Sequence, residues 1–140
     1  MTRTAARISM VVGFAGAAGA LCRYFVSMLG EQGGADFPWS TLAVNLTGCF
    51  LLAFLFYSER ITGRWSAQTR AALSTGFLGS FTTFSALSAE TVMLLDQDRL
   101  WQAGAYLFLS ICLGWLLAAA GCWTAGKDNA RFRLRKEVRP

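Results

Sequence analysis

The chain has 140 residues, of which 54% are hydrophobic and 15% are charged, and its net charge is +5. An average soluble domain carries about 25% charged residues, so this composition indicates a membrane protein. The chain contains no histidine. This excludes a Ser-His-Asp triad, a histidine metal site and a histidine proton switch, and the sequence does not predict an enzyme.

Four stretches of the chain contain no charged residue. They are residues 8–22, 37–58, 71–89 and 100–126. A helix needs about 20 apolar residues to cross the hydrocarbon core, and the first stretch reaches that length only by continuing past Arg23. The sequence therefore predicts an all-α integral membrane protein with four transmembrane helices. We expect these helices at about 8–29, 38–58, 68–95 and 100–124.

Aromatic residues lie near the ends of the predicted helices, as the aromatic belts of membrane proteins do. They are Trp39, Tyr57, Trp65, Trp101 and Trp123. Trp115 lies in the middle of the fourth predicted helix, and we expect it to pack inside the protein.

The basic residues are divided unequally between the two sides of the membrane. Four spans place both termini on one side, and eleven of the 13 basic residues lie on that side. They are Arg3, Arg7, Arg60, Arg64, Arg70, Lys127, Arg131, Arg133, Arg135, Lys136 and Arg139. The opposite side carries only Arg99. The positive-inside rule then places both termini in the cytoplasm, and we expect a multi-pass protein of the cell (inner) membrane.

Residues 127–140 form a basic tail that contains one aromatic residue, Phe132. A basic surface can indicate nucleic-acid binding, but here the charges directly follow a membrane span. We interpret the tail as a cytoplasmic segment that sets the topology and contacts anionic membrane lipid, with no nucleic-acid partner.

Small and polar residues occur at regular spacings within the first two predicted helices. Gly16 and Ala20 have the small-xxx-small spacing that permits close helix packing. Thr41, Asn45 and Gly48 share one face of the second helix. The amide of Asn45 offers two N–H donors, which could bind an anion or form an interhelical hydrogen bond. Both interpretations of Asn45 remain open from the sequence.

The third predicted helix has an unusual centre. From Gly76 to Glu90 it contains two glycines followed by several serines and threonines, which are poor helix formers. We therefore predict a break that frees backbone carbonyls in mid-membrane, where transporters use such carbonyls to hold sodium. Beyond the break, Phe84 and Leu87 are expected on one face with Ser88 beside them. Glu90 is an acidic residue within the span, and Arg23 is a possible charge partner for it.

The fourth predicted helix carries a second polar stripe. Tyr106, Ser110 and Gly114 follow one another at intervals of four residues, which places them on one face. This stripe could be part of a pore or a core with satisfied hydroxyls. Together, the hydroxyls, the amide of Asn45 and the positive edges of phenyl rings suit a small anion better than a cation or a proton relay.

Three blocks of the sequence resemble the fluoride channel family (Fluc, also called CrcB). The segment from Gly16 to Tyr24 is similar to the family's glycine-rich first helix, which ends in Arg-Tyr. Residues 41–50 are similar to its Gly-Thr-Leu-x-Val-Asn-x-x-Gly-Cys-Phe block. Residues 76–90 resemble its Gly-Phe-x-Gly-Gly-x-Thr-Thr-Phe-Ser-Thr-Phe-Ser-x-Glu block.

The resemblance implies a four-helix subunit, residues 1–126, that forms an antiparallel dimer with two fluoride pores. It also implies a structural sodium ion at the centre of the dimer, held by the backbone carbonyls of Gly79 and Thr82. Pore-lining roles would belong to Asn45, Phe84, Ser85, Tyr106 and Ser110. Vestibule roles would belong to Arg23 and Glu90.

Four positions depart from the family pattern. Leu87 stands where the family has its second pore phenylalanine, and Ala86 stands where it has threonine. Gly114 stands where a serine is usual, and Ser80 where a glycine is usual. The charge bias is a further difference, because a homodimer of dual topology needs a nearly neutral bias. We therefore hypothesise that the chain inserts in one orientation and pairs with an oppositely oriented paralogue.

The sequence as a whole favours a passive channel that exports fluoride from the cytoplasm and so reduces its toxicity. One alternative is a non-conducting or half-competent subunit that pairs with a paralogue. A second alternative is a small proton-coupled multidrug exporter. That class needs a carboxylate within the membrane, and Glu90 lies near a helix end.

Overall fold

The computed structural model describes residues 3–31, 37–63 and 65–137, and all regular secondary structure in this part of the chain is helical. The elements are α1 (Arg3–Glu31), α2 (Trp39–Tyr57), α3 (Glu59–Thr62), α4 (Ala67–Ala71), η1 (Ala72–Leu78), α5 (Gly79–Phe81), α6 (Phe84–Asp96) and α7 (Leu100–Glu137).

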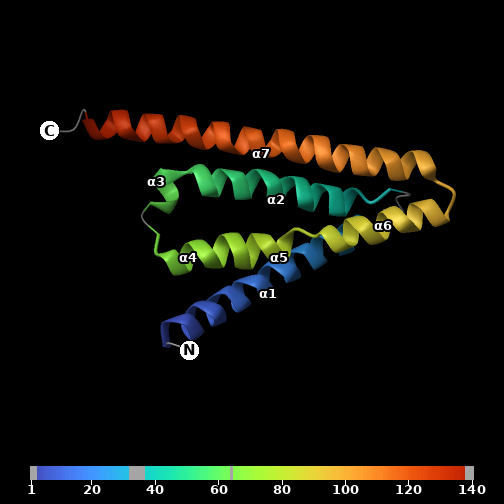
Figure 1. Ribbon diagram of the computed structural model, residues 1–140, viewed down its shortest axis with the longest axis horizontal. Helices are drawn as coiled ribbons and strands as arrows, with labels where there is room; N and C mark the ends of the chain where they lie inside the picture. Colours follow the sequence, from blue (N-terminus) through green and yellow to red (C-terminus); the bar gives the residue numbers. More distant parts are fainter. Residues whose placement is uncertain (1–2, 32–36, 64, 138–140) are drawn as a thin grey trace.

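Four helical segments are long and apolar enough to cross a membrane, and they confirm the predicted spans. They are Ala5–Gly30, Trp39–Tyr57, Ala67–Asp96 and Leu100–Arg131. The start of α1, the connection from α2 to α4 and the end of α7 lie at one end of the bundle (Figure 1). The end of α1, the start of α2 and the turn from α6 to α7 lie at the other end. The chain therefore crosses the bundle four times. We call the end with the start of α1 and the end of α7 the basic end, because most basic residues belong to its segments, and we call the opposite end the acidic end (Figure 1).

The third span is broken, as its composition predicts. It runs through α4, η1 and α5 and then through α6, with Thr82 and Thr83 extended between the two halves (φ −75°, ψ 154° and φ −148°, ψ 123°). The segment η1 is a π-helix, which the sequence analysis did not predict. Figure 1 shows the break as a stretch of coil between α5 and α6 in the middle of the span.

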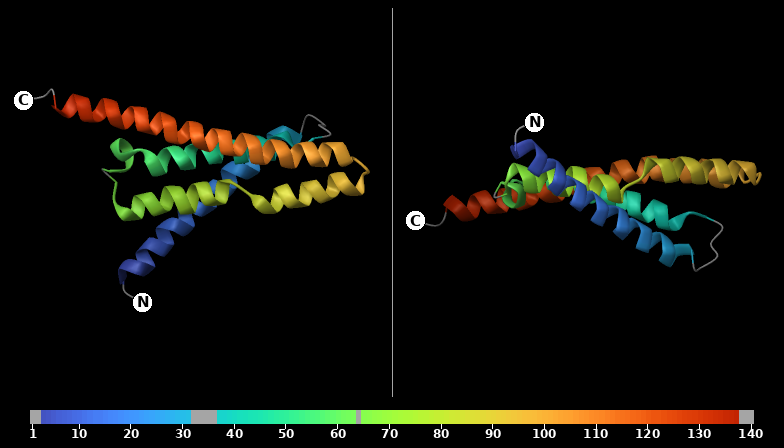
Figure 2. Two further views of the ribbon diagram at one scale, coloured as in Figure 1. Left: turned by 45° about the horizontal axis from the view of Figure 1, so that its top comes forward. Right: turned by 90° about the horizontal axis from the view of Figure 1, so that it is seen from below.

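Helix α1 crosses the third span at close range. It packs against η1 and α5 and runs obliquely to the other three spans (Figure 2). A Cβ atom on Gly19 would overlap the carbonyl oxygen of Phe77, and one on Gly16 would lie 3.0 Å from Ser80 Oγ. The predicted close contact through Gly16 is thus present, and it continues through Gly19 on the same helix.

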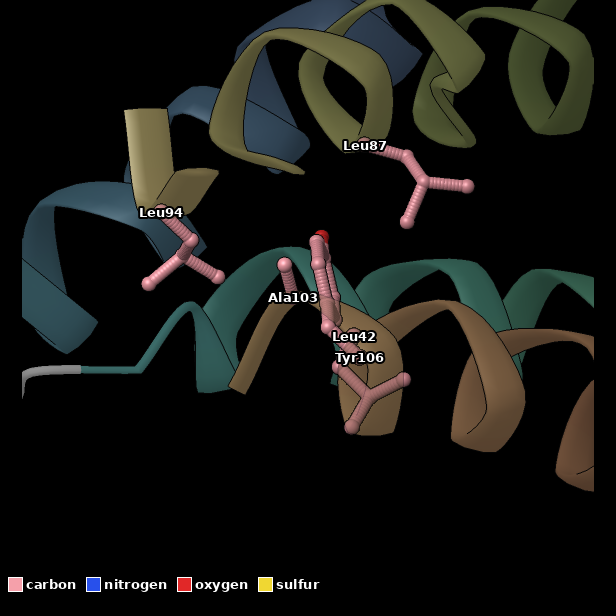
Figure 3. Close-up of a cluster of buried hydrophobic side chains, with 5 residues drawn as sticks. All are labelled: Leu42, Leu87, Leu94, Ala103 and Tyr106. Carbon is pink, nitrogen blue, oxygen red and sulfur yellow. The ribbon is translucent and has the colours of Figure 1, made fainter. Parts of the chain in front are cut away.

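A small apolar core lies between α2, α6 and α7 near the acidic end (Figure 3). It consists of Leu42, Leu87, Leu94, Ala103 and Tyr106. The ring of Phe37 meets Tyr106 edge-on, with 5.5 Å between the ring centroids. This core attaches the second half of the broken span to α2 and α7.

The turn from α6 to α7 has a well-defined hydrogen-bonding pattern. The N–H of Asp98 donates to the carbonyl of Leu95 (3.0 Å), and the N–H of Arg99 donates to the carbonyl of Leu94 (2.9 Å). Asp98 has a positive φ of 57°, a conformation that Asp tolerates better than most residues. These are the bonds of a Schellman motif, which ends α6 and turns the chain into the last span.

Helix α7 continues well beyond the predicted span and includes most of the basic tail, because its helix ends only at Glu137. Asn129 ties this extension to the rest of the protein: its Nδ2 donates to the carbonyl of Tyr57, the last residue of α2, at 2.7 Å. The expected boundary between a channel domain and a tail at residues 126 and 127 thus falls within a continuous helix.

The aromatic residues expected at the membrane surfaces do lie near helix ends, where Trp39, Tyr57 and Trp101 are largely exposed. The prediction for Trp115 was wrong for the single chain, in which its side chain is 76% exposed. Apolar residues in a membrane span can face lipid or another subunit as well as a core, so mid-span position alone does not place a side chain inside.

Candidate functional site

One side chain from the second span, Asn45, forms hydrogen bonds with the backbone at the break in the third span. Asn45 Nδ2 donates to the carbonyl oxygen of Thr83 (2.9 Å), and the N–H of Thr83 donates to Asn45 Oδ1 (2.8 Å). Asn45 thus satisfies both backbone polar groups of one extended residue, which would be costly to leave unpaired in a membrane. The interhelical interpretation of Asn45 is confirmed in the single chain, and one of its two amide N–H groups remains for another acceptor.

Close contact between α2 and the break makes this geometry possible. A Cβ atom on Gly48 would overlap Cγ2 of Thr82, so only glycine lets the second span approach this near. Gly48 lies on the same helix face as Asn45, as the sequence spacing predicted.

Other side chains complete the hydrogen bonding of the break. Arg23 Nε donates to the carbonyl of Ser80 (3.2 Å). Thr83 Oγ1 accepts from the N–H of Ala86 (3.1 Å), which makes Thr83 the N-cap of α6. The Thr83 and Ser85 hydroxyls are 3.1 Å apart and share a hydrogen bond. The capping role of Thr83 was not predicted, although a threonine before a helix start is a recognised signal in a sequence.

These bonds remove the usual helical donors from two carbonyls. In a continuous helix the N–H of Thr83 would bond to Gly79 and the N–H of Ala86 would bond to Thr82. Here the two N–H groups donate to Asn45 Oδ1 and Thr83 Oγ1 instead. The carbonyls of Gly79 and Thr82 are therefore among those at the break that have lost their regular helical partners, whereas the carbonyl of Ser80 accepts from Arg23.

A second polar cluster surrounds Glu90. Thr41 Oγ1 donates to Glu90 Oε1, and the Tyr106 hydroxyl donates to Glu90 Oε2, both at 2.6 Å. Tyr106 is fully buried, and Thr41 is buried as well. The suggested charge pair between Arg23 and Glu90 is wrong, because Arg23 bonds to Ser80 and both oxygens of Glu90 accept from these hydroxyls.

The Glu90 cluster opens into a cavity of about 360 Å³ at the acidic end. Its walls include Phe37, Ser40, Met93 and Arg99, together with Glu90. In the right-hand view of Figure 2, the α6–α7 hairpin diverges from α1 and the start of α2 in this region. Glu90 therefore lies between the hydroxyl groups of the bundle interior and an open space at one membrane surface.

The remaining predicted site residues differ in their environment. Phe84 is 80% exposed and Ser85 is exposed on the single chain, whereas Leu87 is only 9% exposed and packs in the core. Phe84 and Leu87 lie three residues apart on α6, as predicted, but in the single chain Phe84 is open to lipid or a partner whereas Leu87 packs in the core. On α7, Ser110 Oγ is buried and has no hydrogen-bond partner in the described part of the protein.

The predicted polar stripes on α2 and α7 meet at Glu90, and the stripe on α2 also reaches the break. The stripe on α2 supplies Thr41 to Glu90 and Asn45 to the break, while α7 supplies Tyr106 to Glu90. Both stripes were predicted from the sequence, but their connection through Glu90 was not. The signal available in the sequence was that Thr41, Glu90 and Tyr106 are polar residues within spans, which need partners.

An all-helical membrane protein whose third span is broken in mid-membrane, beside an amide and several hydroxyls, has the architecture of an ion channel or transporter. The family described as CrcB-like protein, Camphor Resistance (CrcB), matches residues 10–122. The chain therefore belongs to the CrcB family, which confirms the resemblance seen in its sequence motifs.

Several related proteins are similar over most of their length. The chain is 44% identical to "Fluoride-specific ion channel FluC 2" of Listeria innocua over 114 residues, which cover 80% of this chain and 85% of that protein. It is 48% identical to a protein of the same name from Listeria monocytogenes over 118 residues, covering 84% and 90%. It is 42% identical to "Fluoride-specific ion channel FluC" of Hahella chejuensis over 113 residues, covering 79% and 87%.

Proposed function

We propose that this protein is a fluoride-specific channel subunit of the cell membrane that lets fluoride leave the cytoplasm passively. The observation that carries this proposal is the 42–48% identity to fluoride-specific ion channels across about four-fifths of the chain. An inside-negative potential drives an anion outward with about 2.3 kcal/mol per charge per 100 mV, so no ATP is required. A channel of this family is a transporter and not an enzyme.

Five residues are proposed to line the fluoride path: Asn45, Phe84, Ser85, Tyr106 and Ser110. Fluoride is strongly hydrated, so a selective path must offer hydrogen-bond donors in place of water. Ser110 supports this role because its buried hydroxyl has no partner among the described residues. Asn45 supports it because one amide N–H is left over after the bond to Thr83. The exposed ring of Phe84 can offer its positive edge.

Arg23 and Glu90 are proposed to act in the vestibules at the two sides of this path. The guanidinium of Arg23 carries positive charge close to the break, where it bonds to Ser80. Glu90 lines the cavity at the acidic end. The hydroxyls of Thr41 and Tyr106 donate hydrogen bonds to its carboxylate, and these bonds reduce the repulsion of an anion by Glu90.

A structural sodium ion is proposed to bind to the carbonyls of Gly79 and Thr82. The donor set fits the ion, because hard cations prefer oxygen ligands and both carbonyls have lost their helical donors. These are two groups from one chain. A second subunit related by two-fold symmetry would supply two more, and the ion would then join the two subunits at the break.

The partner is proposed to be an antiparallel second subunit. Phe84 on α6 and Phe108, Ile111 and Trp115 on α7 are large apolar side chains that are exposed on the single chain, and a partner subunit would cover some of them. The unequal distribution of basic residues favours a partner of opposite orientation encoded by a paralogue over a second copy. The basic segment 127–140 is proposed to contact anionic lipid on the cytoplasmic side.

A second candidate function is a subunit that supports the pore of its partner without conducting. Leu87 favours it, because this residue stands where the family has a pore phenylalanine and is buried in the core of its own subunit. The proton-coupled exporter is not supported, because the related proteins are named as fluoride channels and Glu90 is bonded through both oxygens.

Fluoride efflux from liposomes tests the proposal. We expect the purified wild-type protein to release trapped fluoride and Asn45→Asp and Phe84→Ile to slow release at least about tenfold, or about 1.4 kcal/mol in the barrier. Aspartate keeps the acceptor for the Thr83 N–H but loses the donor and adds a charge that repels an anion. Phe14→Ile is the matched control, because Phe14 is similarly exposed on α1.

The outcomes separate the two candidate functions. Wild-type liposomes that retain fluoride contradict a channel made of this chain alone. If addition of an oppositely oriented paralogue then restores efflux that persists with Phe84→Ile in this chain, the protein is the non-conducting partner.

A further inference from the structure

A second cavity lies at the basic end of the bundle, far from the Glu90 cluster. Its volume is about 310 Å³, and it is formed where α2 ends and the third span begins. Leu55, Phe56 and Leu73 supply apolar walls, and Trp65 and Arg70 line it as well. None of these residues takes part in the hydrogen bonding of the break or of Glu90.

The position of the cavity corresponds to the level of the lipid headgroups. Span two ends at Tyr57 and span three begins at Ala67, so the cavity lies where the apolar spans meet the connecting segment. Trp65 is a residue type enriched at this level. The basic end faces the cytoplasmic leaflet, which carries the anionic lipids.

Among the described residues, Arg70 is the one charged residue that lines the cavity, and its side chain is exposed. Within the described residues its guanidinium forms no hydrogen bond or ion pair. The two hydroxyls in the wall already donate to backbone carbonyls: Thr62 Oγ1 to Ser58 and Ser74 Oγ to Arg70, both at 2.7 Å. The guanidinium of Arg70 is therefore available to pair with an anion in the cavity. The hydroxyls of Thr62 and Ser74 can accept further hydrogen bonds but have no proton left to donate.

We propose that this cavity binds one anionic phospholipid of the cytoplasmic leaflet. The phosphate pairs with the Arg70 guanidinium, whose fork of donors matches phosphate oxygens. An acyl chain lies along Leu55, Phe56 and Leu73, where it covers apolar surface. A free inorganic anion would use Arg70 but leave these apolar walls uncovered, so the cavity fits a lipid better. This site is independent of fluoride transport and of the basic segment 127–140.

Titration of lipid into the full-length protein in detergent, followed by native mass spectrometry, tests the proposal. We expect phosphatidylglycerol to bind more tightly than phosphatidylcholine, and Arg70→Gln to weaken phosphatidylglycerol about fivefold, as expected for one basic residue near anionic lipid. Arg7→Gln is the matched control, because Arg7 is exposed at the same end but does not line the cavity.

Two additional arms separate the lipid from other ligands. Phe56→Ala should weaken both lipids, and this change should leave folding intact because Phe56 is 70% exposed. Glycerol phosphate, which has the phosphate but no acyl chain, should not displace phosphatidylglycerol. The proposal is overturned if Arg70→Gln binds like wild type, if Arg7→Gln loses as much affinity, or if glycerol phosphate competes. Arg70→Lys keeps the charge but loses the fork of donors, so it should bind phosphatidylglycerol more weakly than wild type and more tightly than Arg70→Gln, and it serves as a second folded variant.

Discussion

Asn45 shows how much one side chain does in this protein. Its amide pairs with both the N–H and the carbonyl of Thr83 and leaves one N–H over. Each of these backbone groups would cost several kcal/mol if it faced hydrocarbon unpaired. The structural and the ion-binding interpretations of Asn45 are therefore compatible, since the same bonds that hold the break also fix the direction of the remaining donor.

Glu90 poses a similar problem at the residue scale, because a carboxylate within a span needs partners. Removing the Tyr106 hydroxyl with Tyr106→Phe leaves Glu90 Oε2 without its donor. We expect this change to destabilise the protein by about 1–3 kcal/mol, because a hydrogen bond to a part-buried carboxylate is lost. The midpoint of thermal unfolding in detergent measures the effect.

Tyr57→Phe is the control for this prediction, because Tyr57 is largely exposed at the end of α2. Equal midpoints for Tyr106→Phe and wild type would mean that the bond to Glu90 contributes nothing to stability.

At the scale of elements, the third span depends on its neighbours for its shape. Glycines on α1 and α2 let both helices approach the break closely, and Arg23 and Asn45 then reach its backbone. The broken span is thus stable only as part of the bundle, because its centre lacks a complete set of internal hydrogen bonds.

Gly19 offers a direct test of the contact between α1 and η1. With Gly19→Ala the new methyl group would overlap the Phe77 carbonyl oxygen, and we expect a loss of about 1–3 kcal/mol from overpacking. Gly13→Ala is the matched control, since nothing lies within 4 Å of its Cβ position. Lower thermal midpoints for Gly19→Ala and an unchanged or higher one for Gly13→Ala are expected. Equal behaviour of the two variants would contradict the close packing.

The sequence predicted the spans well because gaps in the charge pattern reflect a strong physical constraint. It also predicted a break between Gly76 and Glu90 from weak helix formers. The break was expected before Phe84, but the π-helix that precedes it was not predictable, since it depends on contacts with α1 and α2. Trp115 was misplaced because hydrophobicity does not distinguish core, lipid and subunit surfaces.

At the scale of the whole molecule, the basic residues define one end of the bundle. The end of α1, the start of α2 and the α6–α7 turn lie opposite to them (Figure 1). Helix α7 has 38 residues, about 57 Å at 1.5 Å per residue, which exceeds the hydrocarbon thickness of about 30 Å. Its basic extension therefore stands outside the membrane on the side with the higher positive charge.

This charge distribution predicts a single orientation that does not depend on the extension alone. We expect glutamine at the six basic positions of 127–140 to leave both termini in the cytoplasm. Five basic residues then remain on the cytoplasmic side, and Arg99 is the one basic residue on the opposite side. The five are Arg3, Arg7, Arg60, Arg64 and Arg70. A fluorescent protein fused to the C-terminus reports this orientation, since it matures in the cytoplasm.

Further replacement of these five residues should produce a mixture of orientations, which is the positive control. A mixture already in the wild-type protein would contradict the single orientation and with it the argument for a paralogous partner.

The dependence of the break on Arg23 and Asn45 also sets an order for biogenesis. Ribosomes deliver the spans from the N-terminus, so α1 and α2 are in the membrane before the third span leaves the translocation machinery. The guanidinium of Arg23 and the amide of Asn45, which bond to the backbone of the third span, are then already present. A circular permutation that delivers the third span first would expose Ser80 and Thr83 to lipid without these partners, so the natural chain order protects the weakest segment during insertion.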